Sequence, residues 1–396
     1  MKFVVVAYGS RGDVEPCVAA GRELLRRGHD VRIAVPPNML SFIASTGLTG
    51  VAYGPDSREG MDTASNLLGN LWPAMKNPLS LVSEIIEHVA QVKVEKGATL
   101  TPLANGADLV LAGFNEQGVG TNVAEYYGIP VVALHPFPEQ IWSSGQVFSL
   151  TTKVAEDAQR RALALPEATG PSPRRLEIQA YDELCVPGLA AEWAAGDGRR
   201  PFVGALTLEL PTDADDEVIS WIVAGPPPVY FGFGSTPLAA SADTVAVISA
   251  ACARIGQRAL ICMGPNDFAG IPNPDHVKVV HEVNHAAVFP ACGAVVHHGG
   301  AGTTAAGLRA GTPALILWNG LDQPTWAAAV ERLGVGFGRN FSEATLDSLT
   351  ADLRLILTPR YAIQAREVAT RMTTPAESLA STANLLEHAA RQGRQG

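Results

Sequence analysis

The chain has 396 residues, of which 47% are hydrophobic and 17% charged, which is ordinary for a folded protein with two or three domains. Its formal net charge of −10 argues against a nucleic-acid-binding protein and against anchoring to anionic lipid through a basic patch. The apolar run near the N-terminus is too short for a signal peptide, and no run approaches the roughly 18 residues of a membrane span. We therefore expect a soluble, cytoplasmic monomer or weak dimer, with at most weak peripheral membrane contact.

The five cysteines are scattered along the chain and stand mostly in apolar surroundings. Their odd number and spacing fit neither a disulfide framework nor a zinc site. We expect them to be small core residues in a reducing compartment. They are Cys17, Cys185, Cys252, Cys262 and Cys292.

The first half of the chain predicts an open α/β domain. An apolar run from Lys2 to Tyr8 predicts a buried strand, and a helix over 16–27 and a strand over 31–35 complete a β-α-β unit. Such a unit joins parallel strands by a right-handed crossover. Further strands are predicted over 109–112 and 131–134, with a helix over 119–127 between them.

Two segments of this half stand apart from the sheet pattern. Residues 61–105 include an amphipathic stretch from Leu79 to Gln91, which predicts a helical excursion outside the sheet. This excursion is either the wall of a site for a large ligand or an ordinary pair of peripheral helices. From 139 to 200 the pattern is irregular, and only a helix over 156–165 is predicted.

The second half repeats the alternation of strands and helices. An acidic helix over 211–222 precedes Pro226-Pro227-Pro228, which marks the joint between two domains. Strands are predicted over 229–235, 259–262, 277–280 and 314–318, and helices over 242–255, 286–289, 342–357, 361–372 and 377–391.

The stretch from Val295 to Thr304 carries the strongest chemical signal. A buried strand ends there in three glycines within four residues, and a helix over 304–310 follows. A helix start presents unpaired N–H groups and the positive end of the helix dipole, which suit an anion such as a diphosphate. Glycines alone would serve a tight turn, but the adjoining His and Thr pairs add polar donors that a turn does not need. With a second glycine turn after the strand over 229–235, the pattern predicts a ligand in the cleft between two domains.

Four motifs, in a consistent order over nearly the whole chain, resemble those of GT-B nucleotide-sugar glycosyltransferases that decorate vancomycin-class glycopeptides and glycopeptidolipids. The sequence as a whole is most similar to the glycopeptidolipid sugar transferases. The implied fold class is α/β: two Rossmann-like β/α/β domains face each other across a cleft, and a C-terminal helix crosses back to the first domain. The motifs are Gly9–Pro16, Phe231–Ser235, Glu282–His285, and His297–Thr304 with Asp322-Gln323-Pro324 downstream.

This resemblance implies an acceptor-binding domain over 1–203, a linker over 204–228, a nucleotide-sugar-binding domain over 229–374 and a returning helix over 375–396. The implied reaction is an inverting transfer of a hexose, such as rhamnose or 6-deoxytalose, from a TDP- or UDP-sugar, without a metal or other cofactor. The first candidate for the hydrophobic acceptor is a glycopeptidolipid, and the second is another glycolipid, a lipopeptide or a natural product. Residues 139–200 are shorter than this family's usual acceptor side, so either the pocket is unusually open or mobile segments are missing.

Asp13 matches the general base of the family. A carboxylate titrates near about 4, so it accepts the acceptor's proton only as attack on the sugar proceeds. The alternative role for Asp13 is an N-cap, because it stands just before a predicted helix. His135 is the rival base. Arg11, between Ser10 and Gly12, either reaches the diphosphate or pairs with Glu15 four residues along.

The donor side is carried over from the family by matching positions. His297 contacts the diphosphate, and the hydroxyl of Ser235 joins it, so that charge growing on the leaving group is stabilised. Val283 and Asn284 match the loop that receives the base, largely through backbone groups. Asp322 and Gln323 match the pair that holds sugar hydroxyls, and they also fit a helix cap. The backbone N–H donors for the diphosphate are those of Gly300, Ala301, Gly302 and Thr303.

Other activities on the same plan are also open. Fold alone does not exclude a nucleotide-sugar epimerase. A phosphorylase is disfavoured because Lys278, in a strand-like run, is the one lysine of the second half. A catalytically silent homologue is expected to lack the base or the diphosphate histidine, and both are present. Nicotinamide chemistry is disfavoured because the first glycine loop lacks the G-x-G-x-x-G spacing and the second strand runs into Pro36-Pro37.

Overall fold

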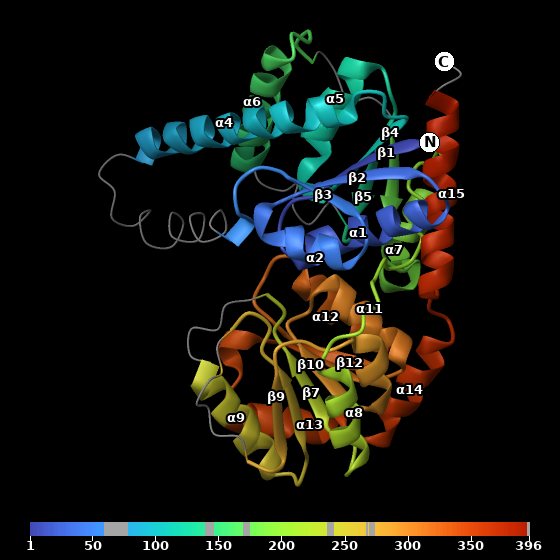
Figure 1. Cartoon of the computed structure of the whole chain (residues 1–396). Helices are drawn as coiled ribbons and strands as arrows, with labels where there is room; N and C mark the ends of the chain where they lie inside the picture. The colour runs from blue at the N-terminus through green and yellow to red at the C-terminus, as the bar shows by residue number, and fades with distance from the viewer. Residues whose placement is uncertain are drawn as a thin grey trace. The chain divides into compact units, whose positions relative to one another are not determined.

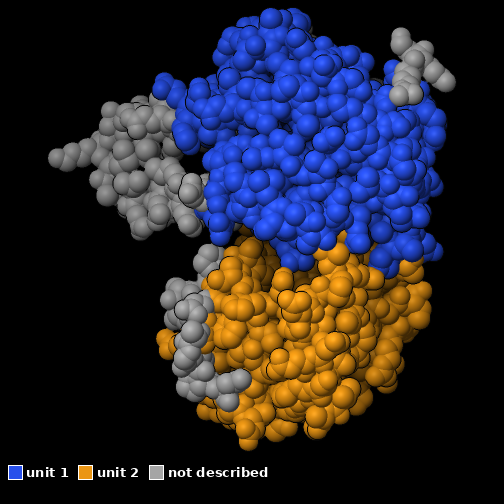
Figure 2. Space-filling model, viewed as in Figure 1, with its two compact units in different colours: residues 1–180, 193–206, 375–396 blue, residues 181–192, 207–374 orange. Residues whose placement is uncertain are grey.

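The computed structural model describes residues 1–58, 78–138, 146–168, 175–235, 241–266, 268 and 274–393 (Figure 1). The chain forms two compact units, coloured separately in Figure 2. Unit 1 comprises residues 1–180, 193–206 and 375–396, and unit 2 comprises 181–192 and 207–374. The sequence predicts a first domain that runs unbroken to residue 203, whereas the structure groups 181–192 with unit 2.

Unit 1 is built on a six-stranded parallel sheet with the order β3-β2-β1-β4-β5-β6. This is the strand order of dinucleotide-binding α/β domains, in which the connections leave the two central strands in opposite directions. The central strands are buried on both faces, which explains their continuous apolar sequences. The strands are β1 (Lys2–Val6), β2 (Asp30–Val35), β3 (Thr49–Ala52), β4 (Leu109–Gly113), β5 (Val131–His135) and β6 (Leu176–Gln179).

The helices of unit 1 begin earlier or extend further than the sequence predicts. The helix after β1 starts at Arg11, five residues before the predicted start, and the long helix that precedes β4 continues to Ala104. The first part of the predicted excursion, 59–77, lies outside the described residues. The helices are α1 (Arg11–Arg26), α2 (Leu40–Ser45), α4 (Pro78–Ala104), α5 (Gln117–Tyr127), α6 (Gln146–Ala162) and α15 (Pro375–Gly393).

The last helix, α15, packs against α1, as the sequence and the family resemblance predict (Figure 1). Leu386 on α15 is fully buried. Arg27, which follows α1, donates from Nη1 to Asn384 Oδ1 at 2.7 Å and pairs with Glu387 at 3.2 Å. The same carboxylate lies 3.1 Å from His29 Nε2. Polar contacts and apolar burial therefore both hold the end of the chain on unit 1.

We expect Glu387→Gln to lower the free energy of unfolding by about 1.5 kcal/mol at pH 7, the lower end of what a hydrogen bond to a charged group contributes. His29, through its hydrogen bond, and Arg27 lower the pKa of Glu387. A lowered folded-state pKa stabilises the fold above the unfolded value, and this contribution is lost as the pH falls through the folded value. The gap between the variant and the wild type in urea unfolding should therefore narrow as the pH falls below the usual value of 4.5. Equal gaps at pH 7 and pH 3 would contradict the assignment, and the exposed Glu367→Gln serves as control.

Unit 2 repeats the plan with a second six-stranded parallel sheet, of order β12-β11-β10-β7-β8-β9. Counted from β7, this is the same strand order as in unit 1, and β7 and β10 are its central pair. The strands are β7 (Val229–Gly232), β8 (Ala259–Cys262), β9 (Val277–Val280), β10 (Ala294–His297), β11 (Ala314–Trp318) and β12 (Gly336–Asn340). The helices are α8 (Asp215–Val223), α9 (Ser241–Ala253), α10 (His285–Val288), α11 (Ala301–Ala310), α12 (Gln323–Arg332), α13 (Leu346–Ile356) and α14 (Pro359–Ala369), and α7 (Pro187–Ala194) spans the division between units.

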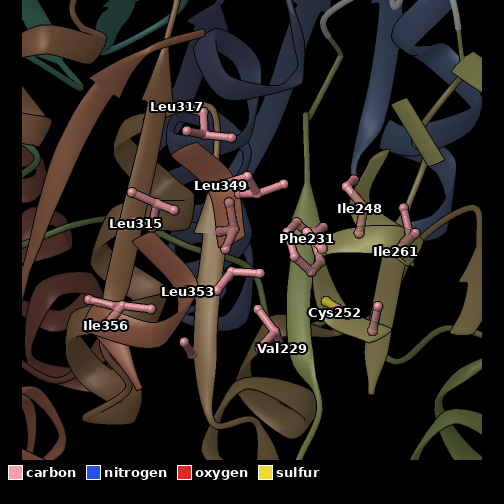
Figure 3. Packing of buried hydrophobic residues seen from close by; sticks show 14 of the residues in the cluster. Val229, Phe231, Ile248, Cys252, Ile261, Leu315, Leu317, Leu349, Leu353 and Ile356 are labelled. Carbon is pink, nitrogen blue, oxygen red and sulfur yellow. The ribbon is translucent and has the colours of Figure 1, made fainter. Parts of the chain in front are cut away.

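The core of unit 2 covers one face of this sheet (Figure 3). Val229 and Phe231 alternate on β7 toward that face, while Tyr230 joins a separate cluster on the other face. Helices α9 and α13 supply the opposing side chains, among them Ile248 and Leu353 (Figure 3). All five cysteines of the chain are buried without disulfides, and burial raises the pKa of the Cys252 thiol to about 12. The prediction that the cysteines are small core residues is confirmed.

Candidate active site

The predicted glycine turns follow the carboxyl ends of the central strands, whereas His135, Val283-Asn284 and Asp322-Gln323 lie at or just after the ends of β5, β9 and β11. In unit 1 the loop 8–10 follows β1, and residues 114–116 follow the adjacent strand β4. In unit 2 the turn Phe233-Gly234-Ser235 follows β7, and His298-Gly299-Gly300 follows the adjacent strand β10. Open α/β sheets bind ligands at this position, because the connections on either side diverge and leave a crevice. Each unit therefore has the loops of a binding site at its own switch point.

Asp13 lies in the first turn of α1, at the third helical position, and Ser10 is the N-cap. The prediction that Asp13 stands before the helix is wrong, because α1 begins two residues earlier. Asp13 Oδ2 accepts from the Ser10 N–H at 2.8 Å and from Ser10 Oγ at 2.9 Å. Gly9, at φ +132°, permits this close approach, since a Cβ there would lie 2.4 Å from Oδ2. The half-buried carboxylate is thus held by a capping box while it remains next to a glycine loop.

Arg11, the first residue of α1, pairs with a neighbour on the same helix. Arg11 Nε donates to Glu15 Oε2 at 2.9 Å, across one helical turn, and its guanidinium lies 4.8 Å from the centre of the Phe42 ring. This confirms the interpretation that Arg11 pairs with Glu15. Gly12 is exposed between Arg11 and Asp13. Nothing in these contacts directs Arg11 toward a diphosphate.

His135 does not fit the role of a base. Its side chain is buried at the end of β5, with Nε2 3.1 Å from Gln117 Nε2. Arg175 donates to the Gln117 Oε1, so the amide turns its N–H toward the imidazole, and Nε2 of His135 is the acceptor. The proton of the neutral ring is then on Nδ1, and burial lowers the pKa of His135 to about 4. The basic nitrogen of His135 is therefore already occupied by a hydrogen bond within unit 1, which disfavours His135 as the base.

In unit 2 the predicted anion turn has the form of a helix start. Gly300 is the N-cap of α11, which begins at Ala301, three residues earlier than the sequence predicts. The first-turn N–H groups of Ala301, Gly302 and Thr303 are therefore those of a helix N-terminus, and Gly302 is exposed. Thr304 turns inward and donates from Oγ1 to the Gly300 carbonyl at 2.9 Å. The turn has the geometry to bind an anion through its backbone.

The two histidines before this turn have different surroundings. His297 ends β10 and is completely buried, and its Nδ1 accepts the Gly299 N–H at 3.1 Å. His298 is only partly buried, and its ring lies against both glycine turns. A Cβ added at Gly234 would lie 2.6 Å from His298 Cε1, and one at Gly300 would lie 2.7 Å from Nε2. His297 is thus a core residue, and His298 is the imidazole next to the start of α11.

The structure favours His298 over the predicted His297 for contact with a ligand. A completely buried His297 reaches a ligand only if the turn rearranges. Burial lowers the pKa of both rings, and that of His297 falls well below its usual value. Both are therefore neutral hydrogen-bonding groups near pH 7. No local sequence signal separates the two rings, because the close approach of His298 to the two glycines is seen only in the structure. Ser235 is exposed and lies on the glycine turn after β7, next to Gly234, as predicted.

Val283 and Asn284 are occupied by structural contacts. The Val283 side chain belongs to the core of unit 2. Asn284 caps α10 by accepting the Ala286 N–H at 3.1 Å, and its own N–H donates to Asp215 Oδ1 at 2.8 Å. The side chains of this pair are therefore committed to the fold. A role in receiving a base is left to backbone groups of Val283 and stays a prediction.

Asp322 and Gln323 stand at the start of α12, where both are held by local bonds. Asp322 Oδ2 accepts from Trp326 Nε1 at 2.7 Å, and Gln323 Oε1 accepts from the Asn319 N–H at 2.8 Å. Burial raises the pKa of Asp322. The preceding Leu321 is a non-glycine residue at φ +59° and is exposed. Such backbone strain is found at ligand-binding turns more often than elsewhere. Asp322 occupies the N-cap position of α12, but its side chain accepts no bond from a helix N–H, so the cap interpretation holds only for position. Contact with a sugar stays a prediction.

Over the described ranges, no three His, Cys, Asp or Glu side chains gather as metal ligands. None of the helices in the described part of the chain is both long and apolar enough to cross a membrane. The predictions that the reaction needs no metal and that the ligand lies in a cleft between two domains stay predictions.

Comparison with known proteins identifies the family. A glycosyltransferase family 28 N-terminal domain model matches residues 3–143, and an erythromycin biosynthesis protein CIII-like C-terminal domain model matches 239–385. The chain is 57% identical to an uncharacterized glycosyltransferase of Mycobacterium tuberculosis (strain H37Rv), covering 100% of both. It is 30% identical to the vancomycin aglycone glucosyltransferase of Amycolatopsis orientalis, covering 96% of both. The chain belongs to this glycosyltransferase family.

Solved glycosyltransferase structures share the fold of this family member. The glycosyltransferase VinC, solved in complex with DTDP, has a TM-score of 0.67 at 21% identity over 100% of both chains. The spinosyn rhamnosyltransferase SpnG has a TM-score of 0.70 at 20% identity over 97% of this chain and 100% of its own. The glycosyltransferase therefore has the GT-B fold, as its sequence predicts.

Proposed function

We propose that this glycosyltransferase moves a hexose or deoxyhexose, such as rhamnose or 6-deoxytalose, from a TDP- or UDP-sugar to a hydroxyl of a hydrophobic acceptor. A glycopeptidolipid is the first candidate acceptor, and an antibiotic or other natural product is the second. Asp13 of unit 1 takes the proton of the attacking hydroxyl, and the oxygen attacks the anomeric carbon from the face opposite the leaving nucleoside diphosphate. The configuration at that carbon is therefore inverted, and no metal takes part.

The observation that carries this proposal is the arrangement around His298. Its imidazole lies between two glycine turns at the switch point of unit 2, beside the free N–H groups of the α11 N-terminus. Neutral donors fixed in this way suit the charge that grows on a leaving diphosphate. The exposed Ser235 hydroxyl on the first turn adds a further donor. Asp13, held in place by Ser10, supplies the complementary acceptor of a proton.

A nucleotide screen tests the donor assignment. We expect TDP or UDP to stabilise the protein by about 2.7 kcal/mol at 100 times its dissociation constant, seen as a rise in melting temperature. Turnover is then measured with TDP-rhamnose, TDP-6-deoxytalose and UDP-glucose on a glycopeptidolipid core, with and without EDTA. We expect EDTA to have no effect on the rate. Stabilisation by neither nucleotide would overturn the donor assignment.

A nucleotide-sugar epimerase is the alternative that this experiment must separate. An epimerase converts the free nucleotide sugar without an acceptor, whereas a transferase releases nucleoside diphosphate in step with acceptor glycosylation. Incubation without acceptor, followed by chromatography of the nucleotide sugars, distinguishes them. Appearance of an epimerised sugar would favour the epimerase.

A further inference from the structure

A buried charged cluster in unit 1 contacts Tyr8, in the loop 8–10 that precedes Asp13. The Lys96 ammonium on α4 donates to Glu116 Oε1 at 2.7 Å, and Tyr53 donates its hydroxyl to Glu116 Oε2 at 2.6 Å. Lys96 is 3% exposed, Glu116 1% and Tyr53 0%. Lys93 Nζ lies 3.7 Å from the same carboxylate. Ion pairs buried this deeply contribute little net stability, because removing charges from water offsets their attraction.

The contacts of this cluster converge on Tyr8, which lies between β1 and α1, the helix that carries Asp13. Lys96 Nζ lies 3.2 Å from the centre of the Tyr8 ring, close enough for a cation–π interaction. The Tyr8 hydroxyl donates to the Pro55 carbonyl at 3.1 Å, and Asn115 Nδ2 donates to the Tyr8 carbonyl at 2.9 Å. Ring, hydroxyl and backbone of one residue are therefore fixed from three directions.

The next residue is Gly9, on which the Asp13 carboxylate packs. Asn115 and Glu116 follow β4, the neighbour of β1, so the contacts to Tyr8 bridge the two strands of the switch point. A shift of Tyr8 would move Gly9 and the Ser10 groups that hold Asp13 Oδ2. This series of contacts connects the buried Lys96 ammonium, through Tyr8, to the orientation of the Asp13 carboxylate.

We infer that Lys96, Glu116 and Asn115 are positioning residues that set the Asp13 carboxylate for catalysis by fixing Tyr8. The inference rests on the proposed role of Asp13 as base. It assigns these three residues no contact with substrate. Their effect is on the turnover step, because a displacement of about 1 Å at a reacting group can cost 100-fold in rate.

Two variants test this. Lys96→Met removes the ammonium and keeps an unbranched chain of similar size, and Asn115→Ala removes one bond to Tyr8 at an exposed position. We expect kcat to fall at least about tenfold in Lys96→Met and a few-fold in Asn115→Ala, with the donor KM and the affinity for TDP unchanged. Arg160→Met is the matched control, since Arg160 is also a buried cation of unit 1 but pairs with Glu125 on α5. Its kcat should equal that of the wild type at temperatures where circular dichroism shows it folded.

The pH profile separates positioning from loss of structure. Burial lowers the pKa of Lys96 to about 8, against the opposing effect of Glu116. The other groups that face Lys96 are Tyr8, Lys93 and Tyr53. Burial raises the pKa of Tyr53 well above its usual value of 10. Lys93 also faces Glu156 on α6, whose pKa is raised by burial against the opposing effect of Lys93. We expect the wild-type kcat to decline above about pH 8 as the ammonium loses its proton, and this step to be absent from Lys96→Met.

The stability change at the same pH has the opposite sign. Because the pKa of Lys96 is lower in the folded state than its usual value of 10.5, its contribution to stability rises between about pH 8 and 10.5. A decline of kcat between about pH 8 and 10.5 therefore does not come from destabilisation of the fold by deprotonation of Lys96. If Asp13→Asn abolishes transfer while Lys96→Met and Asn115→Ala keep full kcat, this inference is overturned and the base assignment stands. If Asp13→Asn is fully active, the base assignment itself fails.

Discussion

Asp13→Asn should lower kcat for sugar transfer by a factor of about 10³ or more, while the affinity for TDP changes by less than about twofold. Asparagine keeps an oxygen that can accept the two bonds from Ser10, so the capping box survives. What is lost is the group that takes the acceptor's proton. General base catalysis typically contributes about 10²–10⁴, so the expected loss is near the upper part of that range. Steady-state kinetics and calorimetric titration with TDP measure the two quantities.

Glu15→Gln is the matched control for this experiment. Glu15 stands on the same helix and has a similar charge, but it pairs with Arg11 at the surface. Exposed pairs contribute about 1 kcal/mol or less, so transfer should stay within a few-fold of wild type. Ser10→Ala removes one of the two bonds to Asp13 Oδ2 and should give an intermediate loss. Full activity in Asp13→Asn would show that the carboxylate serves only as a cap.

The central strands could be predicted from the sequence because their burial on both faces requires continuous apolar runs. β1 and β4 are examples, each buried along nearly its whole length. Three of the four edge strands, β3, β6 and β12, could not, because each is only partly buried and mixes polar residues or glycine with a few apolar side chains. Such an edge strand is fixed by its neighbour's hydrogen bonds, which leave no local pattern. The fourth edge strand, β9, keeps a mainly apolar run, Val277–Val280, and was predicted.

The site was predictable to the level of its loops but not of its side chains. The glycine turns and Asp13 are carried by local motifs, and the structure places them at the switch points. The protonation of His135 depends on Gln117 and on Arg175, a residue 40 positions away in the chain, so no local pattern could give it. The same holds for the contact of Lys96 with Tyr8. Long-range polar contacts of this kind decide which residues of a recognised motif are available for chemistry.

The adjacent histidines show this limit most sharply, and they give the second large prediction. β10 is buried on both faces, so alternation along the strand cannot tell which ring reaches solvent. The structure places His297 in the core and His298 beside Gly300. We expect His298→Ala to weaken TDP binding by roughly 10- to 100-fold, since a hydrogen bond to a charged group contributes about 1.5–3 kcal/mol. We expect kcat to fall as well, because the bond strengthens as charge develops on the diphosphate.

His297→Ala should behave differently because its ring fills a buried site and accepts the Gly299 N–H. Removing it leaves a cavity and an unpaired donor, so the free energy of unfolding should fall by about 2–4 kcal/mol. TDP affinity measured on the folded fraction should change less than in His298→Ala, because only the turn is loosened. Urea unfolding and calorimetric titration of both variants separate the two roles. A large loss of affinity in His297→Ala with wild-type affinity in His298→Ala would reverse the assignment. It would also mean that the turn rearranges to expose the buried ring when the diphosphate binds.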